Sequence, residues 1–425
     1  MKLYIGIDLG TSGCRAVAID ETAAIRARAS RSLPRPETPL RNQHQQDPEI
    51  WWRILCEVLA EIASICGEES PVAIAVDGTS STLLLADHQG NPLTPALMYN
   101  DSRSRDALPL LGGIAPEGNP VLSPSSSLAK LLHLGRTIAT ERYRALHQAD
   151  WIAGRLCGDY RHSDENNALK MGYDPISRAW PAWMADLQLA QDALPEVVPS
   201  GSTVGRLSRQ AADTTGLPPG IAIVAGTTDG NAAFLATGAR ETGEAVTSLG
   251  STLVVKILSE EPVFAAEHGV YSHRLGARWL VSGASNSGGA VLANYFSDDE
   301  MARMTRDLQP QRATGLDYYP LLAPGERFPV NDADYPPRLQ PRPANDLLFF
   351  QGMLEGIANI EAKGYRLLQR LGAARLKHVY SVGGGAKSEP WRQIREQRLR
   401  VPVITAAHHE AAYGTALLAM RGAAE

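Results

Sequence analysis

Tyr4-Ile5-Gly6-Ile7-Asp8-Leu9-Gly10-Thr11-Ser12-Gly13-Cys14-Arg15-Ala16-Val17-Ala18-Ile19-Asp20 consists of two apolar runs separated by a short segment of glycine, threonine and serine. Two such runs around a glycine turn predict a β-hairpin. Asp8 ends the first run, where a carboxylate is costly unless a cation or hydrogen-bond donors meet it. Backbone N–H groups and hydroxyls at Gly10, Thr11 and Ser12 can hold a phosphate, and Asp8 can hold Mg²⁺ through water. The alternative is a tight hairpin whose aspartate caps its turn.

A second stretch repeats this plan near the middle of the chain. Glu244-Ala245-Val246-Thr247-Ser248-Leu249-Gly250-Ser251-Thr252-Leu253-Val254-Val255-Lys256 also runs from strand to turn to strand. Internal repeats reveal architecture, and two such hairpins predict two similar domains, each offering a phosphate-binding turn to a shared cleft. We expect domains over residues 1–237 and 238–425. The second phosphate-binding turn is Gly250, Ser251 and Thr252.

The bulk properties are those of an ordinary globular protein. A chain of 425 residues suggests two domains, and a net charge of −5 does not point to nucleic acid or an anionic membrane. The four cysteines are scattered, without metal-ligand or disulfide spacing, which favours reduced thiols and a cytoplasmic location. No apolar run reaches the length of about 18 residues that a membrane span needs. We expect no nucleic-acid or membrane partner, and a monomer or homodimer.

Strands alternate with helices along the rest of the chain, which is typical of α/β layers. Asp47 and Pro48 are expected to start a helix, as its N-cap and first-turn residue. The segment 126–160 is expected to be mainly helical, with further helices near 187–193 and 207–215. The segment 309–345 holds many prolines and few helical signals, so we expect a surface excursion there.

Asp229 is the candidate general base. It lies in Gly226-Thr227-Thr228-Asp229-Gly230, between a buried strand and a helix that continues through Ala236. A general base must reach the reacting proton where water is limited. The alternative is an N-cap aspartate, which is common at such a junction. Two phosphate hairpins in the same chain favour the catalytic interpretation.

Small polar residues follow two further strands. Asp77-Gly78-Thr79-Ser80-Ser81-Thr82 ends one strand, and Tyr99-Asn100-Asp101 ends another. Ligands bind at the carboxyl ends of strands in α/β proteins, and short hydroxyl, amide and carboxylate groups suit a polyol. The alternative is turn chemistry, which these residue types also favour. The candidate sugar-binding residues here are Thr79, Ser80, Ser81, Asn100 and Asp101.

Gly383-Gly384-Gly385-Ala386-Lys387-Ser388 follows a strand and opens a helix. Glycines there let a flat ligand approach the backbone closely. The segment is not a Walker loop, because Ala386 replaces the glycine before Lys-Ser and the spacing fails. A plain packing turn is the alternative.

Together these segments resemble the FGGY carbohydrate kinases. Gly6–Ser12, Gly226–Gly230, Ser248–Thr252 and Gly383–Ser388 occur in that family's order, and the closing Ala411–Ala416 segment extends the match over nearly the whole chain. The resemblance implies an α/β, two-domain, actin-like ATPase (ribonuclease H-like) fold that binds ATP and a sugar between the domains.

The resemblance also implies roles for individual residues. Asp229 would take the proton from the terminal hydroxyl of the sugar, and Asp8 would position Mg²⁺ beside the sugar. Gly10, Thr11 and Ser12, with Gly250, Ser251 and Thr252, would hold the phosphates of ATP. Gly384, Gly385 and Ser388 would border the adenosine. The cofactors implied are ATP and Mg²⁺.

The substrate prediction rests on one segment above all. Xylulose kinases typically carry Gly-Gln-Met-His-Gly where this chain has Asp77–Thr82, and that segment looks more like ribulose kinases. So do Asn167–Asp174 and Pro324–Pro329. We therefore expect D-ribulose as substrate, with D-xylulose or another polyol as the alternative. Outside this class, a non-catalytic sugar and nucleotide sensor and a chaperone-like ATPase remain alternatives.

Overall fold

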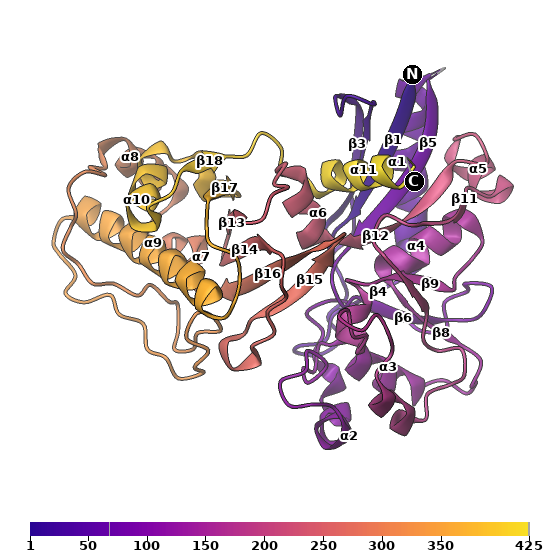
Figure 1. Cartoon of the computed structure of the whole chain (residues 1–425). Coiled ribbons are helices and arrows are strands. Elements are labelled where there is room, and N and C mark those ends of the chain that lie inside the picture. The colour runs from indigo at the N-terminus through magenta and orange to yellow at the C-terminus, as the bar shows by residue number, and fades with distance from the viewer. Residues whose placement is uncertain (68, 424–425) are drawn as a thin grey trace. The chain divides into compact units, whose positions relative to one another are not determined.

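The two predicted hairpins are confirmed, and each belongs to a six-stranded sheet in one of two compact units (Figure 1). The computed structural model describes residues 1–67 and 69–423, so the end of the domain expected over 238–425 lies outside the described residues. The first unit comprises Met1–Ala236 and Glu410–Glu425, and the second comprises Thr237–His409. The C-terminal segment thus groups with the first hairpin. The predicted roles of the two domains, over residues 1–237 and 238–425, stay predictions.

The first unit contains β1 (Lys2–Leu9), β2 (Gly13–Ile19), β3 (Ile25–Ser32), β4 (Gln45–Gln46), α1 (Pro48–Cys66), β5 (Ser70–Gly78), β6 (Leu83–Ala86), β7 (Ala96–Leu97), α2 (Leu108–Ile114), α3 (Ser127–Gly135), β8 (Arg144–His147), α4 (Gln148–Cys157), β9 (His162–Asp164), β10 (Glu196–Val198), β11 (Thr203–Arg206), α5 (Arg209–Thr215), β12 (Ala222–Thr228), α6 (Asp229–Ala236) and α11 (Ala411–Gly422). The second unit contains β13 (Glu244–Leu249), β14 (Leu253–Ser259), β15 (Tyr271–Leu275), β16 (Arg278–Ser285), α7 (Gly289–Ala293), α8 (Asp298–Asp307), α9 (Asp346–Arg370), β17 (His378–Val382), α10 (Glu389–Leu399) and β18 (Val403–Thr405).

The main sheet of the first unit has the strand order β11-β12-β5-β1-β2-β3. Strands β12, β5 and β1 run parallel, so their carboxyl ends meet at one edge. Ile5 and Ile7 of β1 pack in a core with Trp51 and Leu55 of α1. The predicted start of α1 is confirmed, because the Asp47 side chain caps it by accepting a hydrogen bond from the backbone N–H of Glu49 at 3.0 Å.

Helix α1 packs on one face of this sheet, and helix α11 covers the other face, beside β1 and β5 (Figure 1). A Cβ atom on Gly6 of β1 would lie 2.1 Å from the carbonyl oxygen of Ala412 and the backbone nitrogen of Ala416. Glycine is therefore required at position 6, because any side chain would force the helix off the strand. The sheet is buried on both faces, and polar side chains reach a ligand only at its edges.

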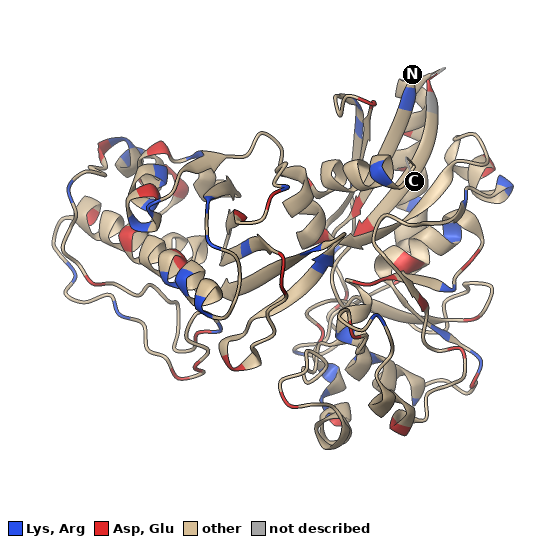
Figure 2. Cartoon of the chain, viewed as in Figure 1, with Lys and Arg blue, Asp and Glu red and all other residues tan. Residues whose placement is uncertain are grey.

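The sheet of the second unit has the order β15-β16-β14-β13-β17-β18, with β13, β17 and β18 parallel. Helix α9 runs along this unit and is buried over most of its length (Figure 1). Figure 2 shows acidic and basic residues interspersed along α8, α9 and α10. The net charge of −5 is thus not gathered on these three helices.

Three sequence predictions differ from the structure. No helix occupies 187–193, where a 3₁₀ helix ends at Leu187 instead. Strand β8 interrupts the expected helical region 126–160, because it pairs with β6. The segment 309–345 has no helix or strand in any of its residues, all of which the structure describes, yet Tyr318, Tyr319 and Phe328 are buried. That segment is therefore part of the core of the second unit and not only a surface excursion.

Among the described residues, no helix is long and apolar enough to cross a membrane.

Candidate active site

Two aspartates lie side by side at the carboxyl ends of β1 and β5. The register of these parallel strands pairs Asp8 with Asp77. Asp8 is 7% exposed and accepts a hydrogen bond from Arg15 Nη1 at 3.0 Å through its Oδ2 atom, and Asp77 is fully buried. The predicted strand-end position of Asp8 is confirmed, and the register adds a second carboxylate beside it.

The environment of this pair disfavours two negative charges. Burial raises the pKa of Asp8, against the opposing effect of Arg15. Burial, and then the charge of Asp8, raises the pKa of Asp77 well above its usual value. Thr415 of α11 donates a hydrogen bond to Asp77 Oδ2, whereas Asp77 Oδ1 has no hydrogen-bond partner. A buried acceptor without a partner is rare, and this one belongs to a carboxyl group whose pKa is raised.

Asp229 completes this acidic edge. Strand β12 pairs with β5 so that Thr227 lies opposite Asp77, and Asp229 begins α6 two residues later. Its charge also raises the pKa of Asp77, so the three carboxylates share one neighbourhood. Asp229 is half-buried, and its Oδ1 atom accepts a hydrogen bond from the backbone N–H of Gly230 at 2.6 Å. The side chain thus contacts the first turn of α6 and remains partly accessible, and its role as general base stays a prediction.

The turn between β1 and β2 is short and open. The backbone N–H of Gly10 donates to the carbonyl of Gly13 at 3.0 Å and closes the turn. Ser12 is exposed, and Gly10 and Thr11 are half-buried. The turn therefore leaves Thr11 and Ser12 accessible, and their contact with phosphate stays a prediction.

The second hairpin turn is fixed by the start of α7. The backbone N–H groups of Gly289 and Ala290 donate to the carbonyls of Gly250 and Ser251 at 2.9 and 3.1 Å. Ser251 is exposed and Thr252 is half-buried. The carbonyls of this turn are thus bonded to the start of α7, while its hydroxyl side chains stay accessible.

The glycine turn after β17 lies directly beside this hairpin. Gly383 has a φ of +87°, and a Cβ atom there would lie 2.7 Å from the carbonyl oxygen of Leu249. Only glycine suits both constraints. A Cβ atom on Gly384 would meet open space, while one on Gly385 would strike Trp391. Ser388 is the N-cap of α10 and accepts from the backbone N–H of Trp391 at 3.3 Å, so its hydroxyl already has a structural role.

A buried ion pair supports both turns of the second unit. Arg395 of α10 and Glu361 of α9 are at most 1% exposed and make two contacts of 2.7 Å. Glu361 also accepts from Thr247 Oγ1 at 2.6 Å, and Arg395 Nη1 donates to Ser381 Oγ at 2.5 Å. Thr247 and Ser381 lie just before the two turns, so one network fixes the ends of β13 and β17 relative to each other.

The predicted sugar-binding residues occupy two loops of the first unit, with unequal exposure. Thr79 is buried and bonded to Gln148 Oε1 at 2.9 Å, and Ser80 is half-buried. Ser81 is 2% exposed, and its hydroxyl has no hydrogen-bond partner. Asn100 is exposed, whereas Asp101 is fully buried and bonded to Arg103. Contact of each with sugar stays a prediction.

The sequence did not single out Asp77, Thr415 or Arg15 as site residues. Asp77 could have been found, because it ends a buried strand exactly as Asp8 does. Thr415 could not, because its contact with Asp77 spans 338 residues of sequence. Among the described residues, no group of three or more histidine, cysteine, aspartate or glutamate side chains has the arrangement of a metal site. Mg²⁺ rarely uses such a cage and usually binds one or two carboxylates together with substrate phosphates and water.

Known proteins resemble this chain over nearly its whole length. Residues 3–236 match the model of the N-terminal domain of the FGGY family of carbohydrate kinases, and residues 245–423 match that of its C-terminal domain. The chain is 27% identical to the xylulose kinase of Escherichia coli K12, over 92% of this chain and 84% of that enzyme. It is 22% identical to the gluconokinase of Bacillus subtilis, over 96% and 84% of the two chains. A crystal structure of a xyloylose kinase from Brucella ovis superimposes with a TM-score of 0.90 at 26% identity, covering 99% of this chain and 90% of that one.

The molecule therefore has the two-domain α/β fold of sugar kinases, as the sequence predicted. The chain belongs to the FGGY family of carbohydrate kinases.

Proposed function

We propose that this chain transfers the γ-phosphate of ATP to the terminal hydroxyl of a ketopentose, with D-xylulose as the first candidate. The observation that carries the proposal is the gathering of Asp8, Asp77 and Asp229 at the ends of three adjacent parallel strands. The names of the similar proteins favour xylulose over other sugars. The preference for D-ribulose, predicted from Asp77–Thr82, gains no support from them, so D-ribulose becomes the second candidate.

In this proposal Asp229 accepts the proton of the sugar hydroxyl while that oxygen attacks the γ-phosphorus of ATP. Asp229 suits the role because it is half-buried and begins a helix at the edge of the sheet. Thr11 and Ser12 of the first hairpin turn, and Ser251 and Thr252 of the second, are the proposed hydroxyl and backbone donors for the phosphates of ATP. Phosphoryl transfer depends mainly on such positioning and on charge stabilisation.

The acidic edge also suits Mg²⁺. Asp8 would hold the hydrated ion, and Asp77 lies beside it on the neighbouring strand. Once bound, the ion would neutralise charge on the phosphates. The glycine turn at Gly384 and Gly385 would border the adenosine, because its backbone lies open at Gly384.

A screen of acceptors tests the proposal. ADP release should be measured with D-xylulose, D-ribulose, L-ribulose, D-gluconate and glycerol, and without acceptor, at one concentration of ATP and Mg²⁺. We expect kcat/KM to be highest for D-xylulose. A preference for D-ribulose would restore the prediction made from Asp77–Thr82. A preference for gluconate or glycerol would overturn the ketopentose assignment, and ATP binding without release of ADP with any acceptor would indicate a sensor.

A further inference from the structure

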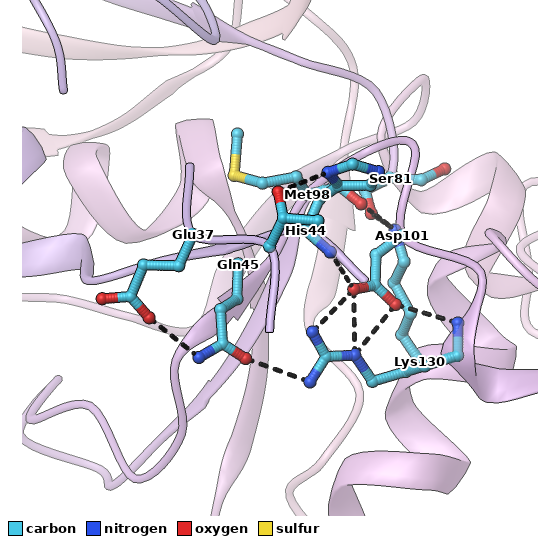
Figure 3. Close-up of polar contacts among 9 residues, drawn as sticks. Glu37, His44, Gln45, Ser81, Met98, Asp101 and Lys130 are labelled. Carbon is cyan, nitrogen blue, oxygen red and sulfur yellow. Dashed lines mark hydrogen bonds and ion pairs between the residues drawn. The ribbon is translucent and has the colours of Figure 1, made fainter. Parts of the chain in front are cut away.

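Lys130 is a buried lysine that joins two separate loops of the first unit. It lies on α3, is fully buried, and donates through Nζ to the backbone carbonyls of Ser81 and Met98, each at 2.7 Å (Figure 3). Ser81 lies in the loop after β5, and Met98 lies just after β7. A single ammonium group thus connects the ends of two strands that belong to different sheets.

This arrangement is costly, which calls for an explanation. Moving an ammonium group out of water is unfavourable unless its charge is compensated, and both acceptors here are neutral carbonyls. Burial accordingly lowers the pKa of Lys130 to about 7. An apolar side chain of similar length would fill the same space without this penalty. What the lysine adds is a hydrogen bond to each of the two carbonyls, and these bonds fix the geometry of the two loops.

The loop after β5 carries further signs of strain. Ser81 has a φ of +67°, in the left-handed region that non-glycine residues rarely adopt. Its hydroxyl is buried without a hydrogen-bond partner. Strained backbone and unsatisfied polar groups persist where the surroundings hold them in place, and they cluster at ligand sites. The contact from Lys130 is on the carbonyl of this same residue.

The loop after β7 is fixed through Asp101. This carboxylate accepts hydrogen bonds from Arg103 Nε at 2.9 Å and from the backbone N–H of His44 at 2.6 Å (Figure 3). Its own backbone N–H donates to the carbonyl of Met98, the same carbonyl that Lys130 contacts. Asp101 and Lys130 therefore hold this loop from two sides.

The helix that carries Lys130 is itself anchored. Ser127 Oγ on α3 lies 2.9 Å from His147 Nε2, and His147 Nδ1 lies 2.9 Å from Asp150 Oδ2, all of them buried. The nearness of serine, histidine and aspartate does not indicate a nucleophile here, because Ser127 is fully buried. The network instead attaches α3 to the end of β8 and the start of α4. Sites need such rigid support to keep their geometry.

We propose that Lys130 is a positioning residue for the sugar, holding the loops after β5 and β7 at the separation that lets the accessible Ser80 and Asn100 contact the sugar hydroxyls. The inference rests on the proposed function, and it concerns sugar binding and not phosphate transfer. Lys130 does not touch the sugar in this proposal. It acts through two backbone carbonyls.

The test compares Lys130→Met, which keeps the length and removes the donors, with Lys130→Gln, which keeps an N–H₂ group without the charge. Lys2→Met, on the exposed start of β1, is the matched control. The KM for the best ketopentose and the KM for ATP should be measured separately. We expect Lys130→Met to lower kcat/KM for the sugar by about 10–100-fold, mainly through KM, because small misplacements near a site have effects of that size. The KM for ATP should stay within about twofold of wild type, a change of less than about 0.5 kcal/mol, and Lys130→Gln should fall between the two.

Hydrogen exchange provides a readout that does not depend on activity. The amides of Thr82 and Asp101 are bonded within the two loops, to Thr79 and Met98 respectively. In Lys130→Met they should exchange faster, while the amide of Gly10 in the first hairpin should not change. If the wild-type protein phosphorylates no ketopentose, the proposed function fails, and hydrogen exchange still decides whether Lys130 holds the loops.

Three outcomes would overturn the inference. Unchanged exchange in both loops would show that Lys130 does not hold them. Equal increases in KM for sugar and ATP, or no increase in either, would show that holding them does not serve sugar binding. Failure of both Lys130 variants to fold would assign the lysine to folding instead.

Discussion

The two six-stranded sheets share a framework but carry different residues at corresponding edges. In each, an antiparallel hairpin is followed by a parallel strand beside its first member, giving β2-β1-β5 in one unit and β14-β13-β17 in the other. Asp8 and Ser248 occupy the same place, two residues before the first glycine of their turns. The strand register then pairs Asp8 with Asp77, but Ser248 with Val382. One edge is acidic and the other is neutral and rich in glycine.

The buried polar groups behind these edges differ as well. In the second unit, Glu361 and Arg395 satisfy each other and tie down both turns. In the first unit, Asp77 keeps an oxygen without a partner, and Lys130 has only neutral acceptors for its hydrogen bonds. A fully satisfied network makes its surroundings rigid, whereas a buried polar group without a partner costs free energy. The two units therefore differ in how completely their buried polar groups are satisfied.

The largest effect should come from the acidic edge. Asp229→Asn should lower kcat by about 10²–10⁴-fold, because loss of a general base has effects of that size. ATP binding, measured by calorimetry, should be retained. Asp213→Asn, an exposed aspartate on α5, is the control and should behave as wild type. Near-native turnover in Asp229→Asn would reduce the residue to a helix-start aspartate and remove the contrast between the two edges.

The next effect concerns stability in the second unit. Arg395→Met leaves Glu361 buried without its partner, and breaking a buried pair typically costs about 3–5 kcal/mol. Scanning calorimetry should therefore show a lower unfolding temperature. The double change Glu361→Leu/Arg395→Met should recover most of the loss, since apolar replacement of both partners is often neutral. Arg366→Met, at an exposed position of α9, is the control. Equal stability of Arg395→Met and wild type would contradict the role given to this network.

An exchange between the two hairpins tests the comparison directly. Asp8→Ser should lower activity by about 10–100-fold and shift the Mg²⁺ dependence to higher concentration, as loss of an outer partner of a metal does. Ser248→Asp should raise the KM for ATP, because a carboxylate beside a phosphate turn repels the nucleotide. Gln311→Glu adds the same charge at an exposed site of the second unit and should have no such effect. An unchanged Mg²⁺ dependence in Asp8→Ser would show that the acidic edge does not bind the metal.

The smallest effect is a pH dependence of stability that comes from Lys130. The other buried cation, Arg395, is paired with Glu361, whereas Lys130 has only neutral acceptors. The pKa of Lys130 is about 7 in the folded protein, lowered first by burial and also by the charges of Lys170 and Arg103, against Asp101. The unfolded chain, with a lysine pKa near 10.4, therefore binds more protons between about pH 7 and 10.4. Stability should rise with pH across that window, by at most about 1.4 kcal/mol per pH unit from this group. Lys130→Met should lack this contribution, as seen in unfolding free energies at pH 7, 8 and 9. Parallel pH profiles for wild type and variant would contradict the assignment.

Local patterns predicted the parts of this molecule that short segments determine. The apolar runs and the glycine turns between them were sufficient for both hairpins, and Asp47 with Pro48 was sufficient for the start of α1. Strand β8 was missed because its pairing with β6 is a property of distant chain segments. The buried part of 309–345 was missed for the same reason, since Glu326 there bonds to Ser285 and Asn286, about 40 residues earlier.

The residues of the candidate site also fall into those that a short segment reveals and those that only the tertiary structure reveals. Asp8 and Asp229 stand out because a carboxylate at the end of a buried strand conflicts with the local pattern. Lys130 gives no such signal, because a lysine in a helix such as α3 is ordinarily solvated, and only the tertiary structure shows that it is buried between two loops. The contact of Thr415 with Asp77 likewise depends on where α11 packs.

The position of α11 has a consequence for how the protein is made. This helix covers the face of the first sheet that contains Tyr4, Val17 and Ala75, yet it is encoded after the entire second unit. A ribosome adds about 5–20 residues per second, so roughly ten to forty seconds pass between synthesis of Ala236 and of α11. During that time an apolar sheet face of the nascent chain lacks its cover and is open to chaperones or to aggregation. A circular permutant that begins with the α11 segment and ends after β18 would shorten this interval, and its yield of folded protein would measure how much the order of synthesis matters.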